Sequence, residues 1–377
     1  MKQHLMIYFL FASLLAVSCT RTKEVEKIPV IYSTDLYQPP QDPDDHYDLA
    51  LLASLPELDV RAIVFDNATE WRDAAQEAGT GALRQMSDIT RQPLPPYAIG
   101  LRNKLISQQD KAENQPAESQ KGVDLILQTL RESQEKIVLF LVGSCRDFAV
   151  AFNREPDLLR EKVKAVYVSA GNGPDGWQFE WNVMLDPQAY ACLMNSGLPI
   201  YWAPCFSQVN LRQATKDEVT NGDQASFNSY YIVPNEAELL ETASGKLKNY
   251  FAYALNKRPG DPVDFLSQPI DTISPKARNM WSTASFFHAA GRKIYLHNGK
   301  YRVYSPEKAQ ALGVAEQEIP VYEFRPVTIE TTEIVADSIV FRGVLDIPQS
   351  NIKVFRYIHS EYNSVMVSAL SGLLEGL

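Results

Sequence analysis

Five aspartates fall within a short N-terminal run of the chain, at Asp35, Asp42, Asp44, Asp45 and Asp48. Carboxylates this close together repel one another unless a cation or strong hydrogen-bond donors neutralise them. Their hard oxygen atoms suit Ca²⁺ or Mg²⁺, although the run lacks the glycine and the closing glutamate of an EF-hand loop. A helix dipole would account for Asp44 or Asp45 as a residue of the first helical turn. It does not account for Asp35, so the run predicts a ligand site.

Short apolar runs and helical patterns alternate through the first half of the chain, and they must position these aspartates. The predicted strands are residues 28–33, 60–65, 136–142, 163–169 and 200–203. The predicted helices are residues 48–58, 71–86, 123–131, 146–152 and 187–195. This alternation predicts an α/β fold with a doubly wound, mostly parallel sheet. Such sheets bind ligands beyond the carboxyl ends of their strands, and Asp35 directly follows the first one.

The alternation weakens beyond about residue 205. Helical patterns are expected at residues 236–255, 280–290 and 362–377, with β-structure at residues 322–345. A hairpin over residues 294–304 should turn at Asn298-Gly299. No linker separates this part, so we expect a domain over residues 30–310. Residues 311–377 are then a C-terminal extension, an appended α+β layer packed on that domain.

The N-terminus has the pattern of an export signal. Lys2 precedes the apolar stretch Leu5–Val17, which is shorter than the roughly 20 residues of a membrane-spanning helix. Residues 15–19 resemble a bacterial lipobox, which predicts a signal peptide over residues 1–19 and an acylated Cys19. The alternative is an ordinary signal peptide with an incidental cysteine. Residues 20–29 would be a tether, and the only membrane contact of this protein in the cell envelope would be its lipid.

Composition narrows the class of partner. The 377 residues carry a formal net charge of −10 and are 45% hydrophobic, enough for a sizeable core. An acidic chain argues against a nucleic-acid partner, which needs a basic face, and permits a neutral sugar or nucleoside. The cysteines after Cys19 match neither a disulfide framework nor a zinc motif. Of these, Cys192 and Cys205 have apolar neighbours and are expected in the core.

Four segments carry a resemblance when read in order. They are Asp35 with Asp42-Pro43-Asp44-Asp45, the strand ending at Asn67, Val142 to Asp147, and Phe179-Glu180-Trp181-Asn182 followed by Asp186-Pro187. This set, spanning about residues 30 to 205, resembles the inosine-uridine-type nucleoside hydrolases. The resemblance implies their α/β fold and the cleavage of the N-glycosidic bond of a ribonucleoside or related N-riboside.

The resemblance also implies roles for individual residues. Ca²⁺ would be held by the carboxylates of Asp35 and Asp45 and by the carbonyl of Val142, with Asp35 as general base toward an activated water. The ribose hydroxyls would be bound by Asp44, Asn67, Glu180 and Asn182. From the residues alone, Asn67 could equally begin a turn, and Glu180 and Asn182 lie in a loop whose aromatics could serve packing. Asp48 is expected at the surface or behind the ligands.

A late His-Asp pair of the family is missing from this chain. Trp281 and Ser282 occupy the corresponding place, within one or two residues. Ser282 would be a weak metal ligand through a neutral hydroxyl, and Trp281 could stack on a base or sugar. His288 lies farther along and reads as a packed helix residue. The first turn also departs from the pattern, because residues 36–41 lengthen it and remove its glycine.

Two functions therefore remain open. The first is a Ca²⁺-dependent hydrolase acting on a nucleoside. The alternative is a non-catalytic lipoprotein that binds a carbohydrate or nucleoside on the same fold, favoured by the missing His-Asp pair and by Trp181, Trp202 and Trp281. The resemblance also implies a possible homo-oligomer.

Overall fold

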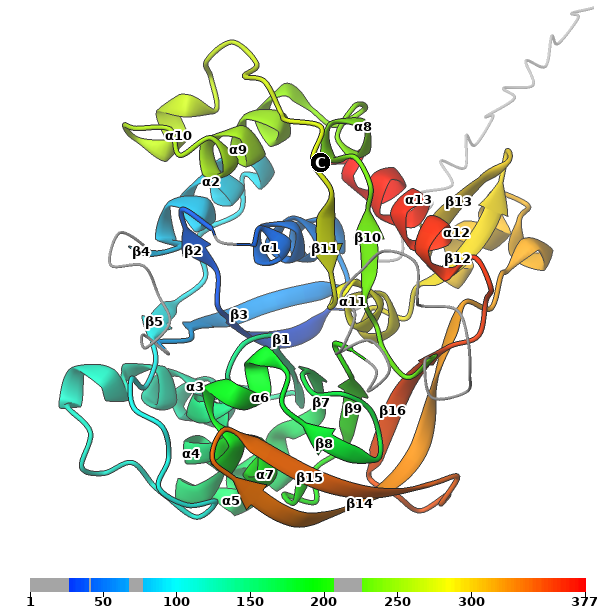
Figure 1. Ribbon diagram of the computed structural model, residues 1–377. Coiled ribbons are helices and arrows are strands. Elements are labelled where there is room, and N and C mark those ends of the chain that lie inside the picture. The colour runs from blue at the N-terminus through cyan, green and yellow to red at the C-terminus, as the bar shows by residue number, and fades with distance from the viewer. Residues whose placement is uncertain (1–26, 41, 68–76, 207–225) are drawn as a thin grey trace, which may run out of the picture.

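The computed structural model describes residues 27–40, 42–67, 77–206 and 226–377 (Figure 1). The predicted signal peptide and most of the predicted tether lie outside these residues. Within them, no helix combines the length and the apolar character needed to cross a membrane.

A ten-stranded sheet forms the centre of the molecule, and seven neighbouring strands in it run parallel. In spatial order they are β5 (Tyr97–Ile99), β3 (Leu58–Phe65), β1 (Ile28–Thr34), β6 (Ile137–Leu141), β7 (Val163–Ser169), β9 (Ile200–Ala203) and β16 (Ile352–Tyr357). Strands β3 and β5 follow β1 toward one edge of the sheet, and β7 and β9 follow β6 toward the other, so the winding direction reverses between β1 and β6. This confirms the doubly wound parallel fold, and such a reversal point is where these sheets bind ligands.

The parallel strands are apolar on both faces because helices cover both (Figure 1). Tyr32 and Phe140 face one layer, whereas Ile31 and Leu139 face the other. The first layer contains α1 (Asp44–Ser54), α2 (Thr80–Thr90), α9 (Gly245–Leu255), α11 (Thr283–Ala289) and α13 (Tyr362–Leu374). The second contains α3 (Lys121–Glu132), α4 (Arg146–Arg154), α5 (Pro156–Lys162) and α7 (Pro187–Met194).

Four predicted helices have clearly different bounds. The helix predicted at residues 48–58 is α1, which begins at Asp44 and ends at Ser54, and Leu58 is already in β3. The described part of residues 71–86 begins with β4 (Glu77–Ala78), and α2 starts only at Thr80. Residues 236–255 form two helices, α8 (Glu236–Leu239) and α9, because Asn235 and Ser244 each cap a separate N-terminus. Met280 belongs to β11 (Arg278–Met280), which pairs with β10 (Tyr231–Val233), so α11 begins later than predicted.

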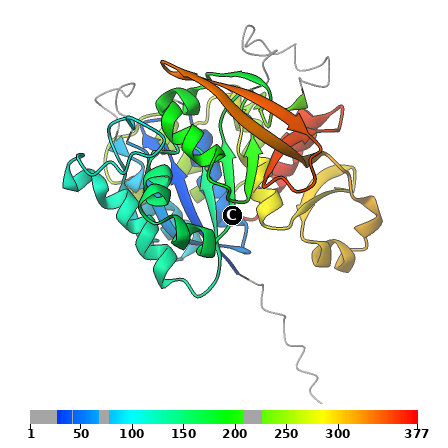
Figure 2. The same cartoon turned by 90° about the horizontal axis from the view of Figure 1, so that it is seen from below.

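The C-terminal region extends the main sheet. Strand β14 (Tyr322–Val335) pairs with β16 and with β15 (Ser338–Leu345), and β15 pairs with β8 (Gly176–Gln178). Residues 311–377 therefore add strands to the edge of the sheet, in addition to packing α13 on its face. Figure 2 shows this hairpin in orange beside the green segment that carries β8.

The predicted hairpin at Asn298-Gly299 is confirmed as β12 (Lys293–His297) and β13 (Lys300–Tyr304), with both turn residues at positive φ. The remaining elements are short. They are β2 (Tyr37–Gln38), α6 (Trp181–Leu185), α10 (Pro262–Phe265), α12 (Pro306–Ala311) and the 3₁₀ helices Ala117–Gln120 and Ala315–Gln317.

Candidate functional site

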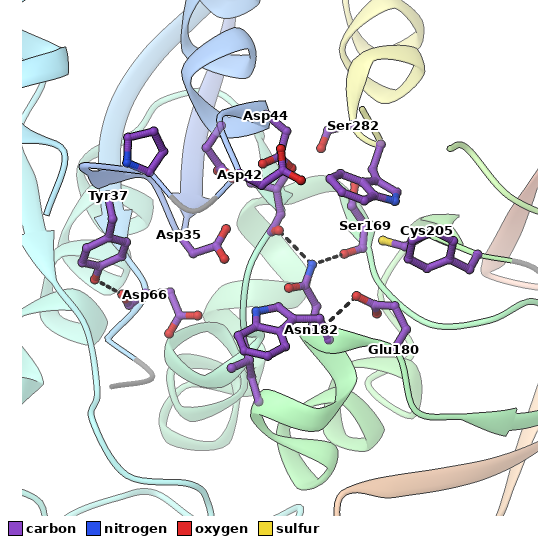
Figure 3. Close-up of a pocket in the computed structure, with 17 residues that line it drawn as sticks. Asp35, Tyr37, Asp42, Asp44, Asp66, Ser169, Glu180, Asn182, Cys205 and Ser282 are labelled. Carbon is purple, nitrogen blue, oxygen red and sulfur yellow. Dashed lines mark hydrogen bonds between the residues drawn. The ribbon is translucent and has the colours of Figure 1, made fainter. Parts of the chain in front are cut away.

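A cavity of about 270 Å³ opens at the carboxyl ends of β1 and β6, where the sheet reverses its winding. Most of the predicted site residues line it. They are Asp35, Asp44, Asp45, Val142, Glu180, Asn182, Trp281 and Ser282. Asn67 does not, and its neighbour Asp66 lines the cavity instead. Figure 3 shows Asp35, Asp44 and Asn182 around the same space.

One wall of the cavity is built by the end of β1 and the first turn of α1. Asp35 follows the last residue of β1, and Asp44 and Asp45 begin the helix. Tyr32 donates a hydrogen bond to Asp45 Oδ1 at 3.1 Å, and Thr34 donates to the same oxygen. The carboxyl of Asp35 is near enough to that of Asp45 to lower its pKa. Two carboxyls this close share either a proton or a cation.

The aspartates of this wall have raised pKa values. Burial, followed by the charge of Asp48, raises the pKa of Asp45 to about 7. Burial also raises the pKa of Asp48 to about 8, with a smaller contribution from Asp35. The pKa of Asp44 is raised by burial and by the neighbouring aspartates, Asp45 first. Among the described residues no lysine or arginine lines the cavity, and no cationic group contributes to the raised pKa values of Asp44, Asp45 and Asp48.

The opposite wall presents hydrogen-bond acceptors. Asn182 is buried, and its Nδ2 donates to the carbonyl oxygens of Val142 and Ser169, each at 2.8 Å (Figure 3). Both amide hydrogens are thus used, which leaves Asn182 Oδ1 as an acceptor. The next residue along from Val142 is Gly143, where a side chain would come within 3.2 Å of both Asp35 N and Asp66 Oδ2. Glycine lets the end of β6 approach Asp35 closely.

Glu180 is held in place by the loop that precedes it. It caps α6 by accepting from Asn182 N at 2.8 Å, and its second oxygen accepts from Gly171 N at 2.6 Å. Burial raises its pKa to about 7, although these backbone donors lower it. Along this segment Trp177, Phe179 and Trp181 are exposed, while the alternate residues Gln178, Glu180 and Asn182 are buried. The extended backbone therefore directs the polar side chains inward.

Aromatic rings form a third side of the cavity. Trp281 packs against Phe206, with ring centroids 5.9 Å apart, and against Tyr230 at 5.6 Å. Its Nε1 is buried and has no hydrogen-bond partner among the described residues. An unpartnered donor in a cavity wall is available to a ligand acceptor. His288 lies elsewhere, bonded to the Tyr167 hydroxyl at 2.7 Å and packed on Tyr201, as the sequence indicated.

Asp66 and Cys205 also line the cavity, although the sequence did not identify them as site residues. Asp66 Oδ2 accepts from Ser144 N at 3.0 Å, and the Tyr37 hydroxyl donates to the Asp66 carbonyl. The signal was available, since both Asp66 and Asn67 follow a strand and adjacent side chains point in opposite directions. Cys205 was expected in the core. It is buried, but it also lines the cavity and is hydrogen-bonded to Glu180.

Within the described residues, no group of three or more His, Cys, Asp or Glu side chains is already arranged as a metal site. The donor set nevertheless fits a hard cation. It combines the neighbouring carboxylates of Asp35 and Asp45 with the Val142 carbonyl, which retains a second lone pair. A cation here would relieve the repulsion that raises the aspartate pKa values. The same acceptors suit a polyhydroxy ligand.

Comparisons with known proteins identify the family of this chain. Residues 30–271 match the family model described as inosine-uridine preferring nucleoside hydrolase. The pyrimidine-specific ribonucleoside hydrolase RihA of Escherichia coli O127:H6 is 26% identical over 42% of this chain and 56% of its own length. That of Citrobacter koseri is 26% identical over 47% and 59%. The chain therefore spans somewhat more than half the length of these curated relatives.

Solved structures share the fold. The inosine-uridine preferring nucleoside hydrolase from Bacillus anthracis has a TM-score of 0.50 and 12% identity, covering 93% of this chain and all of that one. An inosine-guanosine nucleoside hydrolase has a TM-score of 0.51 and 13% identity, covering 92% and 98%. At these identities the likeness supports the fold alone.

Proposed function

The chain belongs to the inosine-uridine preferring nucleoside hydrolase family, and from this premise we propose that it hydrolyses the N-glycosidic bond of a ribonucleoside or related N-riboside with a carboxylate-held Ca²⁺. The observation that carries the proposal is the single cavity that brings Asp35 and Asp45 opposite Glu180 and Asn182. These residues come from three separate segments of the chain. Their convergence at the reversal point of the sheet gives one place for both cation and sugar.

The ribose is bound by the acceptor-rich walls. Asp44, Glu180 and Asn182 accept hydrogen bonds from the sugar hydroxyls, with Asn182 using the Oδ1 that its amide contacts leave available. Backbone donors to Glu180 fix the direction of its carboxylate before substrate arrives. Cleavage of the glycosidic bond develops positive charge on the ribose, and preorganised carboxylates stabilise that charge. Asn67, which lies outside the lining, is not part of this proposed contact set; Asp66 takes the place beside Asp35.

Water activation is proposed for Asp35. Ca²⁺ bound by Asp35, Asp45 and the Val142 carbonyl, with Ser282 beside them, would lower the pKa of a bound water. Asp35 accepts the proton of the attacking water, a role that its place at the end of β1 permits. Asp45 holds its orientation through Tyr32 and Thr34, so its carboxylate stays directed toward Asp35.

The leaving group meets the aromatic side of the cavity. By the resemblance, Trp281 lies within one or two residues of the family's histidine position, and its unpartnered Nε1 donates to an acceptor atom of the departing base. Phe206 and Tyr230 keep the indole ring in place. An indole is a hydrogen-bond donor and not an acid near neutral pH, so bases that leave without full protonation should be the better substrates.

A non-catalytic carbohydrate- or nucleoside-binding role is the second candidate. It is favoured by the missing His-Asp pair and by the exposed ring of Trp181 at the cavity, whereas Trp202 is fully buried and lies outside the lining. A binder would retain the acceptor contacts of Glu180 and Asn182 and would saturate without releasing ribose. Fold alone does not separate these two functions.

For location, we propose an exported lipoprotein held in the cell envelope through Cys19. The support is the apolar stretch Leu5–Val17 followed by a lipobox-like Leu15–Cys19. Labelling with a radioactive fatty acid should mark the full-length protein and leave a Cys19→Ala variant unlabelled. Assembly of the domain as a homo-oligomer is likewise a proposal, measured by light scattering.

The function is tested with a panel of purine, pyrimidine and nicotinamide ribosides, measuring released ribose and base with Ca²⁺ and with a chelator. We expect turnover with Ca²⁺ on at least one substrate. Asp35→Asn should lower kcat by about 10²–10⁴-fold, the usual contribution of a general base. Asp157→Asn, at an exposed carboxylate on α5, is the matched control and should leave kcat unchanged. Saturable binding without turnover on any riboside would instead establish the binding function.

A further inference from the structure

Two buried amide side chains link the two halves of the loop that leads from β7 to Glu180. Gln178 is fully buried, and its Oε1 accepts from Asn172 N at 2.7 Å, while its Nε2 donates to the Gly173 carbonyl oxygen at 2.9 Å. Asn172 is only 1% exposed and returns the contact, because its Oδ1 accepts from Phe179 N at 2.8 Å. The backbone on both sides of the loop is therefore fixed by side chains of the loop itself.

These contacts lie next to a donor that holds the Glu180 carboxylate. Gly171 N donates to Glu180 Oε2 at 2.6 Å, and Gly171 directly precedes Asn172. Gln178 Oε1 lies so close to Gly171 that a side chain there would come within 2.6 Å of it. A displacement of either amide would therefore move Gly171 N relative to the carboxylate. Neither Asn172 nor Gln178 lines the cavity, so both can act on a ligand only through the residues they hold.

Strand β15 of the C-terminal extension holds this loop from the other side (Figure 2). It pairs antiparallel with β8 and places Ile339 opposite Gln178. Ile339 and Phe341 are both buried, and Phe341 packs edge-on against the ring of Trp202 at a centroid distance of 5.9 Å. No described residue after Ser282 lines the cavity. The extension can therefore influence the ligand site only indirectly.

The contact between β15 and the loop is closest at Gly343. Its N donates to Asp175 Oδ1 at 3.2 Å, and a side chain at this position would collide with the Pro174 carbonyl oxygen. Because the obstacle is backbone, even a methyl group would push the loop away from β15. Gly343 is only partly buried, so such a change acts on this contact and not on the core.

We propose that Gln178 and Asn172 are positioning residues that hold Glu180 in place for the ribose, and that strand β15 keeps them there. The inference rests on the proposed function, because that function assigns Glu180 to the sugar hydroxyls. It gives the C-terminal extension a role in a site to which it contributes no lining residue. The position of a preorganised group matters greatly, since a misplacement of about 1 Å can cost about 100-fold in rate.

A double-mutant cycle on kcat/KM tests whether Gln178 acts through Glu180. Gln178→Met keeps the length of the side chain but removes its hydrogen bonds, and should lower kcat/KM by about 100-fold. Glu180→Ala removes the carboxylate that is positioned, so adding Gln178→Met to it should lower kcat/KM by less than about twofold more. Gln85→Met is the matched control, because Gln85 is a buried glutamine on α2 that donates to the Pro262 carbonyl oxygen at 2.7 Å. It should leave kcat/KM unchanged.

Gly343→Ala tests the contribution of β15 without changing the loop residues. It should lower kcat/KM by about tenfold, less than Gln178→Met does, because the loop shifts but keeps its internal hydrogen bonds. This loss should also disappear in the Glu180→Ala background. Val344→Ala, at the next position of β15 where the side chain is 53% exposed, is the matched control and should leave kcat/KM unchanged. Circular dichroism confirms that each variant is folded.

Two results would overturn this inference and leave the proposed hydrolase intact. One is a Gln178→Met protein as active as the parent. The other is an equal loss with and without the Glu180 carboxylate, which would show that Gln178 supports the fold in general. If Gln178→Met does not fold, the cycle with Gly343→Ala decides between the same outcomes. If the parent binds ribosides without turnover, the cycle is measured on the Kd. A parent that neither binds nor cleaves any riboside contradicts both proposals.

Discussion

Two groups of buried charge lie on either side of the loop after β6, and they are stabilised in opposite ways. Arg146 and Asp186 form an ion pair with Nε to Oδ2 at 2.8 Å, in which both side chains are almost fully buried. The guanidinium also donates to the carbonyls of Leu101, Arg102 and Leu185, and Asp186 accepts from the backbone of Leu105 and Ala189. Every charge in this group has a partner within the chain.

Asp45 and Asp48, beside the cavity, have no positively charged group among the causes of their pKa shifts. Asp45 and Asp48 are as buried as Asp186, yet burial and mutual repulsion raise their pKa values to about 7 and about 8. Val142 and Arg146 are only four positions apart, so one loop contributes to both groups. The difference shows that the first group is a scaffold, complete when the chain folds. The second is a site whose stability depends on what enters it.

The largest change in stability is expected when one partner of the scaffold ion pair is removed. Arg146→Met should lower the free energy of unfolding by about 3–5 kcal/mol, because it leaves the buried Asp186 carboxylate uncompensated. Urea denaturation measures the loss. The double variant with Asp186→Leu should recover part of it, since no lone charge then remains. If Arg146→Met were as stable as the parent, the ion pair would make no net contribution to stability, because water would satisfy Asp186 equally well.

A smaller effect on stability is expected at the cavity, and its sign depends on whether the solution contains Ca²⁺ or a chelator. Ca²⁺ at about 100 times its Kd should raise the free energy of unfolding of the parent by about 2.7 kcal/mol. In a chelator, Asp45→Asn should instead be stabilising by about 1 kcal/mol, because it removes a repelled carboxylate. Ca²⁺ should raise the free energy of unfolding of Asp45→Asn by less than it raises that of the parent. Destabilisation by Asp45→Asn in chelator would mean that the aspartates are satisfied without a cation.

The smallest effect is a pH dependence in chelator, carried by Asp45, Asp48 and Glu180 near the cavity and by Asp147 away from it. Their folded pKa values, about 7, 8, 7 and 7, lie above those of the unfolded chain, near 4. Between pH 4 and 8 the folded state binds more protons at these groups, so their contribution to stability is largest near pH 4 and falls as pH rises. Each group contributes at most about 1.4 kcal/mol per pH unit.

The control for this dependence is Ca²⁺ itself. Because Ca²⁺ requires ionised carboxylates, its binding strengthens with pH and should flatten the decline toward pH 8. Melting temperatures across this range, with and without Ca²⁺, measure both curves. A stability that rises with pH in chelator would contradict the assigned directions of the pKa shifts.

The sequence by itself determined the sheet and the place of the site. Buried apolar runs alternating with helices dictate parallel strands, whose carboxyl ends must meet at one edge, and this brought Asp35 and Val142 together. Asp44 and Asp45 were identified in the acidic run, and Glu180 and Asn182 through the resemblance to the family; all four line the cavity.

Only the tertiary structure decided the contacts across the chain. It selected Asp66 over Asn67, because the exit direction of a strand fixes which of two adjacent side chains faces the cavity. It placed Cys205 in the wall, beside Trp281 and Ser282 from a distant part of the chain. The strands of residues 311–377 joined the sheet edge in the same way. Such contacts depend on how helices and strands pack in space. No periodic pattern in the sequence around any one of these residues indicates which distant element it will contact.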